Sequence, residues 1–167
     1  MDTMMEFKNF MKNSNFAEKY ISVEYDERTM DNLREWCARY NISHNYRYDG
    51  TPATGPFTFH TTVIFSTTKH SMINRDVYLK SEEVTPKSFG FLGIDRKIPV
   101  IHLNHSPQIS AIREQYKRLY KIEESFPNYL PHISLSYDPV PDDLFEGLTL
   151  PTFPLVYNKM VIRDADA

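Results

Sequence analysis

The sequence is poor in cysteine and glycine and has no long apolar run, and these shortages exclude several classes of protein. Its single cysteine, Cys37, permits neither an internal disulfide nor a cysteine-based zinc cage, which favours a reducing compartment. No apolar segment approaches the ~20 residues that a membrane-spanning helix needs. The charged residues within segment 1–16 are not typical of a signal peptide. We therefore expect a cytoplasmic protein without membrane contact.

Basic residues are too few for binding to long nucleic acids. The 167 residues include 19 Lys and Arg against 22 Asp and Glu, and the formal net charge is -3. Because proteins that neutralise many phosphates normally have a basic domain, long nucleic acids are excluded as partners. A small anionic ligand in a local pocket is not excluded. The length fits a single domain, residues 1–167, which is assumed to be a monomer.

Apolar spacing predicts two main amphipathic helices. Asp26 is a typical N-cap for the first, and Ser106 followed by Pro107 is typical of the start of the second. Leu119 is expected on the core face of the second helix. Helices are thus expected over residues 27–40 and 107–120, with a shorter one over residues 7–16.

The remaining apolar segments have the alternation and β-branched content of strands, which together with the helices predicts an α+β fold. Segment 41–56 is a long polar loop, 87–93 is a glycine-containing aromatic loop, and 142–154 is either a lid or a solvated loop. Strands are expected over residues 20–25, 57–65, 78–84, 98–103, 132–137 and 155–162.

The two halves of the chain, approximately 20–96 and 97–162, repeat one order of elements: strand, helix, connection, strand. The last strand of this series in each half contains a histidine followed two residues later by a residue with a hydroxyl group, in His60-Thr61-Thr62 and His132-Ile133-Ser134. Residues i and i+2 of a strand point to the same side. Each half therefore presents an imidazole beside a hydroxyl.

The other histidines are weaker candidates. His44 and His70 lie in polar stretches and are expected to be solvated, and His105 is expected in a loop. His102 lies on a strand that borders the expected site, but it lacks a hydroxyl at i+2.

Two facing pairs of imidazole and hydroxyl suit phosphodiester chemistry. One imidazole takes a proton from the nucleophile, the other gives a proton to the leaving oxygen, and the hydroxyls of Thr62 and Ser134 hold the phosphoryl oxygens. This exchange requires no metal, and no dense carboxylate cluster accompanies the histidines. We therefore expect neither a metal nor another cofactor.

These paired motifs resemble the H-x-[T/S] signatures of the two-histidine (2H) phosphoesterase superfamily. Within it, the stretches Ile21–Asp26, Pro131–Asp138 and Phe153–Lys159 resemble the phage anti-CBASS nucleases, which destroy the cyclic oligonucleotide messengers of bacterial antiviral signalling. The similarity extends over roughly residues 20–162. Ser134 stands where the superfamily motif commonly has threonine; it keeps the hydroxyl donor.

The resemblance implies a bilobal fold, with two pseudo-symmetric antiparallel sheets lining a central cleft and helices packed outside. It also implies that a ribose 2′-hydroxyl attacks the neighbouring 3′–5′ phosphodiester, with His60 and His132 as base and acid in an order that the sequence leaves open. Family members stack the nucleobase between aromatic rings, and the best-matching positions are Tyr25 and Phe91. The substrate would be a cyclic di- or trinucleotide in the cytoplasm of an infected bacterium.

Two other functions fit the same residues. The first is a 2′,3′-cyclic or 2′–5′ phosphodiesterase that acts on RNA ends, as in other branches of the superfamily. The second is a nucleotide sponge, which would bind its ligand without cutting it. Only the enzymes need the histidines for proton transfer, so product analysis separates the three hypotheses.

Overall fold

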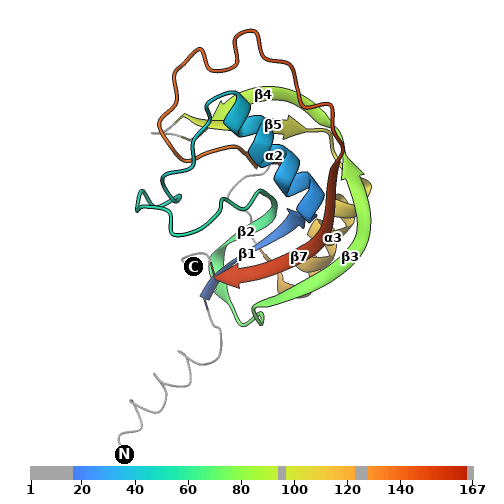
Figure 1. The fold of residues 1–167 in the computed structure, drawn as a ribbon. Coiled ribbons are helices and arrows are strands. Elements are labelled where there is room, and N and C mark those ends of the chain that lie inside the picture. The colour runs from blue at the N-terminus through green and yellow to red at the C-terminus, as the bar shows by residue number, and fades with distance from the viewer. Residues whose placement is uncertain (1–16, 94–96, 123–127, 165–167) are drawn as a thin grey trace, which may run out of the picture.

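The computed structural model describes residues 17–93, 97–122 and 128–164, so the helix expected over residues 7–16 lies outside the described residues. The described part contains strands and two helices, labelled as in Figure 1. The helices are α2 (Glu27–Arg39) and α3 (Pro107–Tyr120). The strands are β1 (Ala17–Tyr25), β2 (His60–His70), β3 (Arg75–Val84), β4 (Pro86–Leu92), β5 (Ile98–Leu103), β6 (His132–Ser134) and β7 (Leu155–Asp164).

The strands form two antiparallel sheets, which confirms the α+β class. The first sheet has the order β2-β1-β7-β3 and the second has the order β4-β5-β6. Each sheet takes one strand from the other half of the chain, because β7 joins the first sheet and β4 joins the second. The edge strands β2 and β6 pack against each other. The strands with the paired histidines therefore meet where the sheets adjoin.

Both helices begin at the residues that the sequence predicts. The Asp26 carboxylate accepts a hydrogen bond from the Thr29 N–H at 2.8 Å, and the Ser106 hydroxyl accepts one from the Ile109 N–H at 3.3 Å. These bonds satisfy N–H groups that have no partner within the helix. Neither described helix combines the length and the apolar character needed to cross a membrane.

Each helix contacts the side of a sheet that faces away from the paired histidines. The Trp36 ring of α2 lies 5.9 Å from the Phe89 ring of β4, and Gln108 of α3 accepts a hydrogen bond from the Tyr157 hydroxyl of β7 at 2.6 Å. Ile101 and Ile133 share the face of Phe89 by strand pairing and are fully buried. The opposite faces of the two sheets are left for polar side chains.

Segment 87–93 and Leu119 differ from the sequence predictions. Segment 87–93 was predicted to be a loop, but most of it forms β4, because its backbone pairs with β5 and its phenylalanines supply an apolar face. Leu119 was predicted to be in the core and is 64% exposed. Arg113 takes the inward position on α3, where it donates a hydrogen bond to the Val63 carbonyl at 2.8 Å.

Ile21 tests the packing of the first sheet, since it is 1% exposed at the centre of β1. Ile21→Val removes one buried methylene, so we expect it to lower the free energy of unfolding by about 0.5–1.5 kcal/mol in urea titrations. Ile73→Val is the matched control because Ile73 is 67% exposed, and it should change stability by less than about 0.5 kcal/mol. Equal effects of the two substitutions would contradict the packing described.

Candidate active site

His60 and His132 occupy equivalent positions in the two sheets. Each is the first residue of an edge strand, His60 in β2 and His132 in β6, and these two strands pack against each other. Both side chains are half-buried. The charge of the His60 imidazolium reaches His132, where it disfavours protonation of the second ring. The structure therefore brings the two predicted histidines into one site.

The two imidazoles are anchored in the same way. Nδ1 of His132 lies 2.9 Å from the Leu130 carbonyl oxygen, and Nδ1 of His60 lies 3.4 Å from that of Thr58. A carbonyl oxygen only accepts, so each Nδ1 carries a proton and Nε2 is the basic nitrogen of the neutral ring. Among the described residues neither Nε2 has a hydrogen-bond partner. Both nitrogens are thus available to a ligand.

A tyrosine fixes the position of β6 relative to β2. Tyr129, three residues before His132, donates its hydroxyl to the Thr62 carbonyl at 2.7 Å. The Arg113 guanidinium lies 4.0 Å from the centre of the Tyr129 ring and also donates to the Val63 carbonyl. These contacts join the two histidine strands through α3, and sequence patterns give no indication of them because the partners are far apart in the chain.

The two predicted hydroxyls lie on the same strand faces as the histidines. Thr62 follows His60 by two residues and pairs with Ser22, and Ser134 follows His132 by two residues and pairs with Val100. The Ser22 hydroxyl is buried, and no hydrogen-bond partner for it occurs in the described part of the chain. A buried donor of this kind is costly unless a ligand or water satisfies it. Ser22 thus adds a third hydroxyl to the site, next to Thr62.

The surroundings of His60 lower its pKa, although two neighbouring groups oppose that effect. Burial lowers the pKa of His60 below its ordinary value, while the Thr58 carbonyl and the Glu24 carboxylate act in the opposite direction. Glu24 lies directly across the strand pair from His60, and its carboxylate is 3.5 Å from the Lys159 ammonium. His60 therefore has an acidic neighbour on its own sheet.

The neighbouring charges that act on His132 are positive, whereas the one that acts on His60 is negative. Burial is the main cause that lowers the pKa of His132; the Leu130 carbonyl raises it, and the charges of His102 and His60 lower it further. His102 lies directly across the strand pair from His132, with 6.5 Å between the ring centres. The structure thus adds a third histidine to the two expected ones.

A cavity of about 770 Å³ opens beside His60. Ser22, Glu24 and His60 contribute the strand side of its wall, and much of the rest comes from the long polar loop that the sequence predicts over residues 41–56. Its aromatic lining consists of Tyr20, His44, Tyr46, Tyr48, Phe57 and Tyr137. The cavity combines flat apolar surfaces with hydroxyl, carboxylate and guanidinium groups next to one of the paired histidines.

His44, which was expected to be solvated, belongs to this wall. Its ring stacks on Phe57 with 4.4 Å between centres, and its Nε2 lies 2.6 Å from the Leu135 carbonyl oxygen. Burial lowers the pKa of His44, and the Leu135 carbonyl opposes that effect. The alternation of polar and aromatic residues around His44 was the available signal, but it does not reveal which rings will meet.

The structure does not bring the two predicted stacking residues to the histidines. Tyr25 is 4% exposed, and its hydroxyl shares a 2.8 Å hydrogen bond with Thr61, whose side chain is also buried. Phe91 lies on the face of its sheet opposite His132 and contacts Phe145, with 5.1 Å between ring centres. Successive side chains of a strand point to opposite faces, so the position of Phe91 within β4 determines the face on which it lies. A segment that is predicted to be a loop does not indicate such a face.

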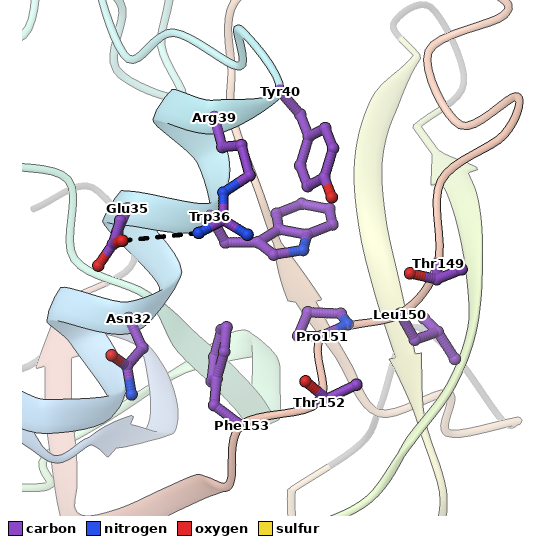
Figure 2. A pocket seen from close by; sticks show the side chains of 10 residues that line it. All are labelled: Asn32, Glu35, Trp36, Arg39, Tyr40, Thr149, Leu150, Pro151, Thr152 and Phe153. Carbon is purple, nitrogen blue, oxygen red and sulfur yellow. Dashed lines mark ion pairs between the residues drawn. The ribbon is translucent and has the colours of Figure 1, made fainter.

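Segment 142–154 packs away from the histidine cavity. The Phe145 ring stacks on Phe89 at 4.4 Å, and no residue of the segment lines the 770 Å³ cavity. Its last part instead lines, together with α2, a second cavity of about 340 Å³, shown in Figure 2, to which α2 contributes Trp36 and the segment contributes Pro151. None of the ten residues lining this second cavity is a histidine.

Over the described ranges, no three His, Cys, Asp or Glu side chains are arranged to hold a metal ion.

Residues 17–166 match the family model described as anti-CBASS protein Acb1, and this match covers most of the chain. A search of curated proteins found no match.

Proposed function

The chain belongs to the Acb1 family of anti-CBASS proteins, and we propose that it is a metal-independent phosphodiesterase that cleaves 3′–5′ bonds in cyclic di- and trinucleotides. The observation that carries this proposal is the doubled arrangement at His60 and His132. Each imidazole is held through Nδ1 by a carbonyl two residues before it, and each is followed two residues later by a hydroxyl. Two similar basic nitrogens in one site suit a paired proton transfer.

The cleavage step uses these groups in a balanced exchange. As the ribose 2′ oxygen forms its bond to phosphorus, its proton moves to Nε2 of one imidazole. The bond from phosphorus to the 5′ oxygen breaks, and the other imidazolium gives its proton to that oxygen. The products are a 2′,3′-cyclic phosphate and a 5′-hydroxyl. The hydroxyls of Thr62 and Ser134 would donate to the phosphoryl oxygens, where negative charge accumulates.

The cavity beside His60 is the proposed place of a nucleoside. Phe57 and Tyr137, whose ring centres lie 5.4 Å apart, provide aromatic surface in its wall. They are better placed to stack on a base than the predicted Tyr25 and Phe91. Stacking contributes about 1–3 kcal/mol per base and tolerates different bases, which fits an enzyme acting on several messengers. Few phosphates need neutralising, so the net charge of -3 is compatible with this substrate class.

Incubation with a 3′–5′ cyclic dinucleotide in excess EDTA tests the proposal. We expect a linear product with a terminal 2′,3′-cyclic or opened phosphate, detected by mass spectrometry. A control dinucleotide with 2′-deoxyriboses should remain intact, because it lacks the attacking hydroxyl. Intact ligand recovered from the ribonucleotide reaction would contradict the enzyme and support a sponge.

A linkage panel separates the remaining enzymatic alternative. Preferred cleavage of 2′–5′ linkages or of 2′,3′-cyclic ends, with 3′–5′ rings left intact, would indicate an RNA-end phosphodiesterase. We expect the opposite preference. Loss of cyclic messengers in the cytoplasm of an infected bacterium would then block the antiviral response, which is the cellular role we propose.

A further inference from the structure

His102 lies on the same face of the second sheet as His132. The two residues are direct partners in the pairing of β5 with β6, and their ring centres are 6.5 Å apart. Both are half-buried, so neither imidazole has the full solvation that would screen its charge. The third histidine is therefore a close neighbour of one paired histidine, and it comes from a different strand.

A glycine provides the space that His102 occupies. Gly90 of β4 lies beneath the His102 ring: a Cβ at this position would lie 2.5 Å from Nε2 and 2.8 Å from Cδ2 of the imidazole. No side chain larger than hydrogen fits without displacing the ring. The backbone of β4 thus holds His102 in the position from which it faces His132 across the strand pair.

The charged neighbours of the two paired histidines are opposite in sign. His132 has His102 on β5 and His60 on β2, and Lys87 of β4 influences His102 in turn. His60 has Glu24 directly opposite it on β1, and the Lys159 ammonium of β7 lies 3.5 Å from that carboxylate. Cationic neighbours disfavour an imidazolium and a carboxylate favours one. The site is therefore asymmetric although its two sequence motifs are alike.

We propose that His102 is a positioning residue that keeps His132 uncharged as the general base, while Glu24 favours the protonated form of His60 as the general acid. This inference rests on the proposed phosphodiesterase function and specifies which histidine has which role. His132 Nε2 receives the proton of the 2′-hydroxyl, and His60 Nε2 donates its proton to the departing 5′ oxygen. Glu24, like His102, acts on the reaction through its neighbouring histidine.

Histidine titration by NMR tests the part played by His102 without any substrate. We expect His102→Asn to raise the pKa of His132 by about 0.5 or more, since a like charge at this separation is removed. Gly90→Ala, which displaces the ring, should shift it in the same direction. The double variant should match His102→Asn alone, because both changes act through one imidazole.

His70→Asn is the matched control for this titration. His70 is the last residue of β2, ten residues from His60, and its Nε2 lies 2.9 Å from the Thr68 hydroxyl. We expect no change in the pKa of His132 in this variant. An unchanged pKa of His132 in both His102→Asn and Gly90→Ala would overturn the role of His102.

A substrate with a sulfur atom in place of the bridging 5′ oxygen tests the assignment of acid and base. A thiolate is a much weaker base than an alkoxide and leaves without a proton donor. We expect His60→Ala to cleave this substrate at a rate within about tenfold of the wild-type rate. His132→Ala should still cleave it far more slowly than the wild type, because the 2′-hydroxyl still needs a base. Rescue of His132→Ala instead would reverse the assignment. If the wild type leaves the all-oxygen ring intact, the proposed function fails, whereas the titration still decides the role of His102.

Discussion

Replacing either His60 or His132 with alanine is expected to lower kcat for cleavage of a cyclic dinucleotide by about 10²–10⁴-fold, the usual contribution of one general acid or base. The reason is that each imidazole has a separate task, so neither replaces the other. Because Nδ1 of each ring is held by a backbone carbonyl, only Nε2 reaches the substrate. Initial rates in EDTA, measured at saturating substrate, give the effect on kcat directly.

Thermal unfolding and binding measurements complete this test. Both variants should still bind the cyclic dinucleotide, since the hydroxyls and the aromatic walls of the cavity remain. His70→Ala, a change at the far end of β2, should leave the rate within about twofold of the wild type, as expected for a surface substitution. A folded His60 or His132 variant that retains a tenth or more of the wild-type rate excludes the paired proton transfer.

Short-range patterns predicted the parts of the fold that short-range physics determines. The caps at Asp26 and Ser106 form because a side-chain oxygen lies within reach of an N–H three residues ahead. The spacing of His60 and Thr62 placed them on one face, since the side-chain period of a strand is two. The class of fold followed from these local periods.

The rest of the site depends on partners that are distant in the chain. His102 was discounted because it has no hydroxyl at i+2, yet its relation to His132 comes from pairing between β5 and β6. Phe91 was placed in a loop because Gly90 and Gly93 flank it, yet Gly90 accommodates the His102 ring within β4. A glycine needed for close approach and one needed for a turn look alike in a sequence.

The wall of the cavity shows the same dependence on distant contacts. Loop 41–56 is polar and contains glycine and proline, which indicates a loop but not where it lies. Asp138 determines its place: the carboxylate is 2.9 Å from the backbone nitrogens of both Asn45 and Tyr46, and 2.7 Å from the Ser43 hydroxyl. Asp138 lies in one of the stretches that resemble the anti-CBASS nucleases, but its spacing suggested no role.

Asp138→Ala is therefore expected to destabilise the protein and to loosen the substrate cavity. The carboxylate is 5% exposed, and its removal leaves the Asn45 and Tyr46 N–H groups and the Ser43 hydroxyl without their acceptor. We expect a loss of about 1.5–3 kcal/mol in the free energy of unfolding, the usual net contribution of hydrogen bonds to a charged group. KM for the cyclic dinucleotide should rise roughly tenfold, equivalent to about 1.4 kcal/mol of lost preorganisation. Urea unfolding and steady-state kinetics measure the two effects.

The pH dependence of this loss identifies the ionised carboxylate as its cause. Burial opposes ionisation, but the hydrogen bonds from Asn45, Ser43 and Tyr46 outweigh it and lower the pKa of Asp138. A group with a lowered folded-state pKa stabilises the protein above its unfolded pKa of about 3.9 and loses that contribution as the pH falls through the folded value. The difference in stability between wild type and Asp138→Ala should thus be constant near neutrality and shrink below about pH 4.

Asp142→Ala is the control, a change at a carboxylate whose side chain is 80% exposed, and its stability should differ little from that of the wild type at any pH. A stability difference for Asp138→Ala that persists unchanged at low pH would mean that packing, and not the carboxylate, holds the loop against the site.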